Sequence, residues 1–123
     1  MVVVRTERSQ HEVELSVRAN LNETTVAEFR AALYSELEGP QERITLDLER
    51  VQTASSSALG AMLLFQKKAR ERGKALAIGH CHPELKQTLL AIRFDRSIQM
   101  EGQAPPGVPV QADQPGPPAS SGG

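Results

Sequence analysis

The chain has 123 residues, of which 14 are basic and 15 acidic, so its formal net charge is −1. This length fits one domain, and the balanced charge excludes the broad basic face that nucleic-acid binding needs. The single cysteine, Cys81, rules out an internal disulfide and fits a reducing compartment.

The sequence opens with two predicted strands. Residues 2–4 are three consecutive valines, and residues 12–17 alternate so that Val13, Leu15 and Val17 share one face. The polar residues between them suit a hairpin connection. We therefore expect an antiparallel hairpin at one edge of a sheet.

A helix with a marked start and a marked end is predicted next. Thr25 and Glu28 have the spacing of a capping box, in which the hydroxyl and the carboxylate satisfy two free backbone N–H groups. Gly39-Pro40 is the predicted stop, because proline cannot continue the helix. The apolar stripe of this helix consists of Val26, Phe29, Leu33 and Leu37.

A third strand and a second helix are predicted in the middle of the chain. Residues 44–48 alternate between apolar and polar side chains, which indicates a strand. The serine run 55–57 is the expected start of the helix, and Gly73 is its expected end.

The last elements complete an alternation of strands and helices. Residues 75–78 are a short apolar strand, Pro83 fits the first position of a third helix, and residues 97–100 are a weak final strand. Strands alternating with helices imply βαβ crossovers. We therefore predict a single α/β domain with a mixed, mostly parallel β-sheet, an N-terminal antiparallel hairpin and about three to four helices.

The composition changes at Gly102, after which six of the eight prolines and only one charged residue, Asp113, are found. Such a segment cannot bury enough apolar surface to offset its ordering entropy. We expect a domain at residues 1–101 and a disordered Pro/Gly-rich tail at residues 102–123. The tail is interpreted as a linker, with a polyproline ligand at residues 105–110 as the alternative.

No stretch of the sequence predicts a targeting or membrane segment. Residues 2–4 are too short for the apolar core of a secretory signal. The longest apolar run, residues 61–65, is far below the roughly 20 residues that a membrane span needs. We expect a cytoplasmic protein without membrane insertion.

Residues 44–63 resemble the central motif of the STAS family, which bacterial anti-sigma-factor antagonists typify. In that family an apolar strand and a short connection precede an Asp-Ser-Ser/Thr-Gly-Leu-Gly-like sequence and an amphipathic helix. Here Ser57 falls on the serine that a partner kinase phosphorylates, and Leu59-Gly60 falls on Leu-Gly. Residues 20–25 are similar to the family's Gly-x-Leu-Asp segment ahead of its first helix. In the order and spacing of elements, the resemblance covers about residues 2–100.

The resemblance implies a non-enzymatic regulatory module that needs neither cofactor nor metal. Its implied partners are an anti-sigma-factor-type serine kinase, or a related signalling protein, and a phosphatase. Phosphorylation at Ser57, with Ser56 as the alternative, would release the kinase and so regulate transcription by partner switching. The implied partner-binding residues are Asn22, Thr24, Thr25, Ser55, Ser56, Ser57, Ala58, Leu59 and Gly60.

Three positions depart from the family pattern. Ser55 replaces the usual acidic residue before the serine pair, Ala58 replaces the glycine after it, and Asn22 replaces an aspartate. Two carboxylates are therefore missing near Ser57. Their loss favours the alternative function, a constitutive STAS-type structural subunit of a lipid-transport or stress-signalling complex that is not phosphorylated.

Elementary chemistry supports a switch at Ser57 independently of the family. A hydroxyl beside the first helical turn faces free N–H groups and the positive end of the helix dipole, so the fold tolerates the added charge of about −1.5 to −2. A partner docked over the hydroxyl would have to desolvate this dianion, and a penalty of ~3 kcal/mol weakens binding by more than about a hundredfold. The alternative is that the three serines only cap a helix.

Other candidate sites have less support. In an extended chain Cys81 points away from His80 and His82, so these potential zinc ligands do not converge, and we expect a loop with a partly buried thiol. The sequence lacks a Gly-x-Ser-x-Gly elbow and a phosphate-binding loop, so we expect no enzyme. The basic residues within 67–72 are interpreted as a solvated helix end, with a contact for an acidic partner as the alternative.

Overall fold

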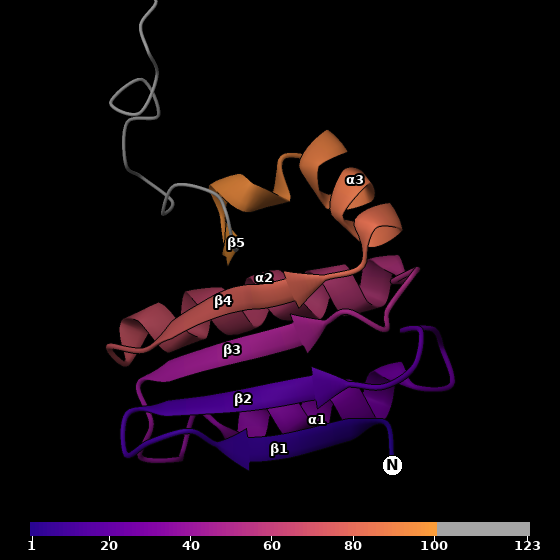
Figure 1. The fold of residues 1–123 in the computed structure, drawn as a ribbon. Coiled ribbons are helices and arrows are strands. Elements are labelled where there is room, and N and C mark those ends of the chain that lie inside the picture. The colour runs from indigo at the N-terminus through magenta and orange to yellow at the C-terminus, as the bar shows by residue number, and fades with distance from the viewer. Residues whose placement is uncertain (101–123) are drawn as a thin grey trace, which may run out of the picture.

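Five strands form one sheet in the order β1-β2-β3-β4-β5 (Figure 1). The strand β1 (Val3–Glu7) pairs antiparallel with β2 (Glu12–Val17). The strands β3 (Arg43–Leu48), β4 (Ala75–Cys81) and β5 (Gln99–Met100) each pair parallel with the strand before them. The predicted mixed sheet with an N-terminal hairpin is confirmed in this computed structural model, which describes residues 1–100.

Two long helices cover one face of the sheet, and Figure 1 shows α1 (Val26–Ser35) and α2 (Ser56–Glu71) on that face. A third helix, α3 (Pro83–Ala91), and the 3₁₀ helix η1 (Phe94–Arg96) connect β4 to β5. Pro83 lies in the first turn of α3, as predicted. The predicted linker at residues 102–123 and the domain boundary at residue 101 lie outside the described residues.

The core lies between the sheet and the two long helices. The alternation in β2 places Val13, Leu15 and Val17 inward, while the opposite face of the sheet carries polar side chains such as Glu14 and Thr45. Between α1 and α2, the rings of Tyr34 and Phe65 stack with their centroids 6.1 Å apart. The helices bury Phe29, Leu33, Met62 and Phe65 against the sheet.

The start of α1 differs from the prediction. The side-chain oxygen of Asn22 accepts hydrogen bonds from the backbone N–H groups of Thr24 (2.9 Å) and Thr25 (3.2 Å). In return, Thr25 Oγ1 accepts from the Asn22 N–H at 3.0 Å. The reciprocal capping pair is therefore Asn22 with Thr25, and the predicted capping box of Thr25 with Glu28 is wrong.

Glu28 instead fastens α1 to the first strand. Its Oε2 accepts hydrogen bonds from the backbone N–H groups of Val2 (2.7 Å) and Val3 (3.0 Å). These donors stabilise the ionised carboxylate and hold the pKa of Glu28 below its usual range. A long-range contact therefore outcompetes the local cap.

The Glu28→Gln variant should lose part of the acid sensitivity of the fold. Because the folded-state pKa of Glu28 lies below the unfolded value of about 4.3, the carboxylate stabilises the fold above that pH and stops doing so as the pH falls through the folded value. Urea unfolding at several pH values between about 3 and 6 should show a shallower loss of stability in Glu28→Gln than in the wild type. Glu23→Gln, a change at an exposed residue, serves as control, and equal pH slopes in all three proteins would contradict the assignment.

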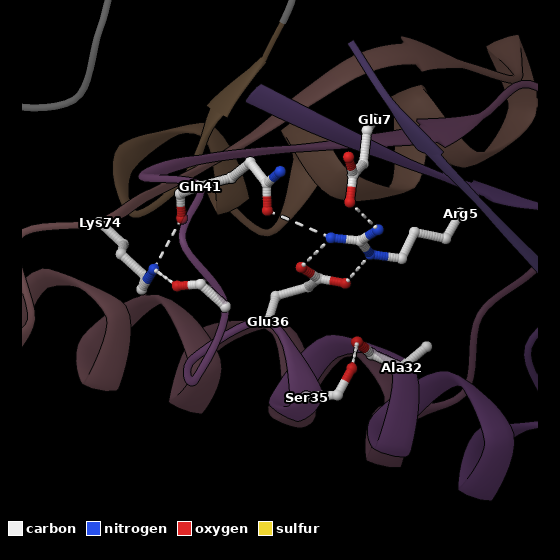
Figure 2. Close-up of polar contacts among 8 residues, drawn as sticks. Arg5, Glu7, Ala32, Ser35, Glu36, Gln41 and Lys74 are labelled. Carbon is white, nitrogen blue, oxygen red and sulfur yellow. Dashed lines mark hydrogen bonds and ion pairs between the residues drawn. The ribbon is translucent and has the colours of Figure 1, made fainter. Parts of the chain in front are cut away.

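A polar cluster joins β1 to the end of α1 and to the connection before β3 (Figure 2). Arg5 Nε donates to Glu36 Oε2 at 2.6 Å, and Arg5 Nη2 donates to Gln41 Oε1 at 3.1 Å. Lys74 Nζ donates to the carbonyl oxygens of Gly39 (2.7 Å) and Gln41 (2.6 Å). The helix α1 ends at Ser35, before the predicted stop at Gly39-Pro40. From Glu36 to Gly39 each backbone N–H donates to the carbonyl three residues earlier, so the chain continues to Gly39 in tighter turns.

The strand β4 is longer than predicted and includes His80 and Cys81, which were expected in a loop. Leu46 pairs with Ile78 but Asp47 pairs with His80, so Gly79 is the extra residue of a β-bulge. His82 begins α3, because its Nδ1 accepts from the Glu84 N–H at 3.1 Å. The final strand is shorter than predicted, since only Gln99 and Met100 pair with β4.

Gln66 of α2 is a buried polar residue in an otherwise apolar helix face. Its Oε1 accepts from the Leu76 N–H at 3.0 Å, and its Nε2 donates to the Ser97 carbonyl oxygen at 3.3 Å. The amide therefore satisfies backbone groups of β4 and of the segment before β5, and it fixes α2 against that side of the sheet.

Candidate functional site

The start of α2 lies beside the segment that leads into α1. Leu21 and Ala54 form a parallel bridge. The Leu21 N–H donates to the Thr53 carbonyl oxygen at 3.1 Å, and the Ser55 N–H donates to the Leu21 carbonyl oxygen at 2.8 Å. The structure therefore joins the two segments in which the sequence predicted partner-binding residues.

Asn20 positions both segments, although it is not among the predicted partner-binding residues. Its side-chain oxygen accepts from the backbone N–H groups of Gln52 (2.8 Å) and Thr53 (3.3 Å). Its carbonyl oxygen accepts from the hydroxyl of Thr25 at 2.7 Å. An asparagine before a turn is a common pattern, and nothing in the sequence pairs it with residues 52–53.

The three serines at the start of α2 have different roles. Ser55 is the N-cap, with an extended backbone (φ −70°, ψ 164°) and an oxygen that accepts from the Ala58 N–H at 3.2 Å. Ser56 and Ser57 are the first two helical residues and are exposed to solvent. The interpretation of the serine run as a helix cap therefore applies to Ser55. Within residues 1–100 the Ser57 hydroxyl makes no hydrogen bond, so another molecule can reach it without breaking one.

Most of the other predicted partner-binding residues lie at the surface. Asn22, Thr24 and Gly60 are exposed, while Thr25 and Leu59 are half-buried. Ala58 is the exception, because its side chain is fully buried in the core and cannot reach a partner. The exposed and half-buried members of this set form the predicted docking surface, called the docking surface below: Asn22, Thr24, Thr25, Ser55, Ser56, Ser57, Leu59 and Gly60.

The electrostatic environment of Ser57 suits an added anion. The first turn of α2 contains no acidic residue, so no carboxylate competes for the free N–H groups at the helix start. The basic residues of this helix, Lys67, Lys68 and Arg70, lie toward its other end. The helix terminus can therefore accept a negative charge on Ser57 without an adjacent repulsion from its own first turn.

Outside this surface, the described residues contain one free thiol, that of Cys81. Cys81 is half-buried, and its burial raises the pKa of the thiol, against a smaller opposite effect of Lys86. A thiol of this kind is a poor nucleophile at neutral pH. Within residues 1–100, no three His, Cys, Asp or Glu side chains are grouped so that they could hold a metal ion. None of the helices there is long and apolar enough to span a bilayer.

Several solved structures have this fold. A Thermotoga maritima protein shares 20% sequence identity at a TM-score of 0.71, over 80% of this chain and 84% of that one. An anti-sigma factor antagonist from Mycobacterium paratuberculosis shares 12% at a TM-score of 0.71, over 82% and 85%. The Bacillus anti-sigma factor antagonist SpoIIAA, in its unphosphorylated form, shares 14% at a TM-score of 0.68, over 80% and 86%.

Sequence comparison identifies the family. No curated protein matches the chain. A family model described as "Mlab, STAS domain" matches residues 4–101, which include every described helix and every described strand except Val3 at the start of β1. The chain therefore belongs to this STAS domain family, STAS_2.

Proposed function

We propose that this chain is a regulatory protein-binding module whose partner contacts the docking surface and is released by phosphorylation of Ser57. The observation that carries the proposal is the division among the serines: Ser55 caps α2, while Ser57 lies exposed in the first turn of the helix. The proposed partner is an anti-sigma-factor-type serine kinase, and a phosphatase restores the unmodified form.

The physical basis of the switch is desolvation. An interface can cover a neutral hydroxyl at small cost, whereas a phosphate carries about −1.5 to −2 charges and a tightly held hydration shell. The fold survives this change because Ser57 belongs to no internal hydrogen bond of the described residues. Phosphorylation therefore changes the surface and leaves the core intact.

The comparisons support the proposal by analogy. SpoIIAA has been solved in a phosphorylated as well as an unphosphorylated form, and the phosphorylated form matches this chain at a TM-score of 0.63 with 14% identity. That protein is described as an anti-sigma factor antagonist, and the phosphorylated form is a form of that protein, not of this chain. What the comparison shows the two proteins to share is the fold.

The direct test is the intact mass of the protein recovered from its native host, with and without phosphatase treatment. We expect a fraction of the protein to be heavier by one phosphate, to lose that mass with phosphatase, and to carry the group on Ser57 in peptide mapping. A protein that is unmodified under every growth condition would contradict the switch.

Ser57→Asp should weaken binding of the native partner at least about tenfold, which corresponds to about 1.4 kcal/mol. The carboxylate introduces a charge that the interface must desolvate, although it carries less charge than a phosphate. Isothermal titration calorimetry with the purified partner measures this effect. Ser57→Ala is the matched neutral control and should bind as the wild type does, whereas unchanged affinity of Ser57→Asp would count against the proposal.

Gly60→Ala should stabilise the fold by about 0.5–1 kcal/mol and still weaken partner binding. A Cβ atom at Gly60 would meet nothing within 4 Å in this chain, so the fold itself does not require the glycine. We infer that glycine is present at position 60 because it lets a partner's backbone approach α2 closely. Urea unfolding and calorimetric titration test the two effects separately, and a more stable variant with unchanged affinity would remove Gly60 from the docking surface.

A second function is favoured by the missing carboxylates. The first turn of α2 has no acidic residue, and the capping residue before α1 is the neutral Asn22. A constitutive structural subunit of a lipid-transport or stress-signalling complex would use the same surface without phosphorylation, and the matching family model is described by the name Mlab. The intact-mass experiment separates the two functions, because this subunit would be unmodified.

A further inference from the structure

The second half of α2 exposes two large apolar side chains beside a groove. Leu63 is 40% exposed and Leu64 is 46% exposed, although both belong to a helix that buries its other face in the core. A groove of about 440 Å³ adjoins Leu63. Its lining residues are Leu63, Gln66, Lys67, Arg70, Glu71 and Ser97.

The rim of this groove is basic. Lys67, Lys68 and Arg70 are exposed, and within residues 1–100 none of them forms an ion pair. The groove lining itself contains Lys67 and Arg70 against one acidic residue, Glu71, and Lys68 lies next to Lys67 in the helix. The surface therefore combines apolar contact area with uncompensated positive charge.

The buried amide in the groove lining, that of Gln66, already has hydrogen-bond partners within the chain. The Gln66 amide is engaged at both ends, by the Leu76 N–H and by the Ser97 carbonyl oxygen. A ligand can therefore bury apolar groups against Leu63 without leaving that amide unsatisfied.

We propose that this groove binds an amphipathic helix of a partner protein with apolar side chains on one face and carboxylates beside it. The apolar side chains pack on Leu63 and Leu64, and the carboxylates pair with Lys67 and Arg70. Such helix-in-groove recognition uses residues spaced along one face of a helix. The inference rests on the proposed function, because it extends the docking surface by one to three turns along α2 from Gly60 and adds an acidic segment to the partner.

Two other occupants fit the observations less well. A second copy of this chain would place the same basic rim against itself across a two-fold axis, which is repulsive. An anionic membrane would satisfy the lysines, but the patch has only two leucines and no aromatic side chain among the groove residues, so little apolar area would enter a bilayer. Charge complementarity with an acidic protein segment uses the leucines and the rim together.

The test uses the full chain and a synthetic probe. The probe is a helical peptide of about 18 residues, five turns long, with leucines on one face and glutamates flanking them. The control peptide has lysine in place of every glutamate. We expect the acidic peptide to shift the amide resonances of Leu63, Lys67, Arg70 and Ser97 in two-dimensional NMR spectra of the labelled protein, and to bind more weakly as salt is raised.

Charge-reversal variants make the test specific. Lys67→Glu and Arg70→Glu should each weaken binding of the acidic peptide by at least about fivefold, because each replaces an attraction with a repulsion. Arg43→Glu reverses an exposed charge on β3, away from the groove, and should leave the affinity unchanged. The proposal is overturned if the basic peptide binds as well as the acidic one, if neither shifts these amides, or if all three variants respond alike.

The competing occupants have their own readouts. Concentration-dependent self-association in sedimentation that Leu64→Glu abolishes would replace the acidic partner with a second copy. Binding to phosphatidylglycerol vesicles that exceeds binding to the acidic peptide would replace it with a membrane. Failure of the peptide test leaves the Ser57 switch intact, since that switch is tested by mass and by Ser57→Asp, and failure of the Ser57 tests leaves the peptide result unaffected.

Discussion

Replacing Arg5 with methionine should lower the free energy of unfolding by about 3 kcal/mol, because it leaves the buried carboxylate of Glu36 without a counter-charge. The Arg5 guanidinium binds both oxygens of the Glu36 carboxylate, with Nε–Oε2 at 2.6 Å and Nη2–Oε1 at 3.3 Å. The side chain of Glu36 is only 4% exposed, against 39% for Arg5. The buried Glu36 carboxylate therefore needs Arg5 as its counter-charge, whereas the more exposed Arg5 can still be solvated by water without Glu36. Urea unfolding of Arg5→Met measures the cost of losing that counter-charge.

Two further variants identify the unpaired charge as the cause. Glu7→Gln removes the other carboxylate that binds Arg5. Because the Glu7 side chain is exposed, this variant should lower the free energy of unfolding much less than Arg5→Met does. The double variant Arg5→Met/Glu36→Leu removes both charges and should regain most of the lost stability. If the double variant is as unstable as Arg5→Met alone, packing of the arginine stem and not charge accounts for the loss.

Gly79→Ala should destabilise the fold by about 2 kcal/mol through overpacking. A Cβ atom at Gly79 would lie 2.8 Å from the Cγ2 atom of Thr45 on the neighbouring strand. Neither residue can easily move away, because both belong to paired strands at the bulge between β3 and β4. Thermal and urea unfolding should show the loss directly.

The clash has a matched rescue. Thr45→Ser deletes the Cγ2 methyl group and keeps the hydroxyl that donates to Glu12 Oε2 at 3.0 Å. The double variant Gly79→Ala/Thr45→Ser should therefore recover most of the stability that Gly79→Ala loses. Gly60→Ala adds the same methyl group in open space and shows the effect of the substitution without a clash. No recovery in the double variant would place the strain in the backbone of the bulge.

The order of strands and helices could be predicted because it depends on local patterns. Alternation fixed the inward face of residues 12–17, and a serine run marked a helix start that the structure places at Ser56 with Ser55 as its cap. The prediction of the capping box was wrong because a residue distant in the sequence makes the hydrogen bonds instead. Glu28 does not cap α1 because its carboxylate accepts hydrogen bonds from the N–H groups of Val2 and Val3.

The candidate site shows the same division. Ser57 and Gly60 could be named from the sequence because they follow a strand and open a helix. The sequence could not show that Asn20 holds the neighbouring segment through the backbone of Gln52 and Thr53, since no local pattern links these residues. Nor could it show that Ala58 points into the core, because which side of the first turn faces inward depends on how α2 packs on the sheet.

The stacked pair of Tyr34 and Phe65 gives this protein a built-in optical probe. The chain has one tyrosine and no tryptophan, so its ultraviolet emission and its near-ultraviolet circular dichroism come chiefly from this ring between α1 and α2. Separation of the two helices would change both signals without any attached dye. A tryptophan-containing partner excited at its own longer wavelength would then be observed without interference from this chain.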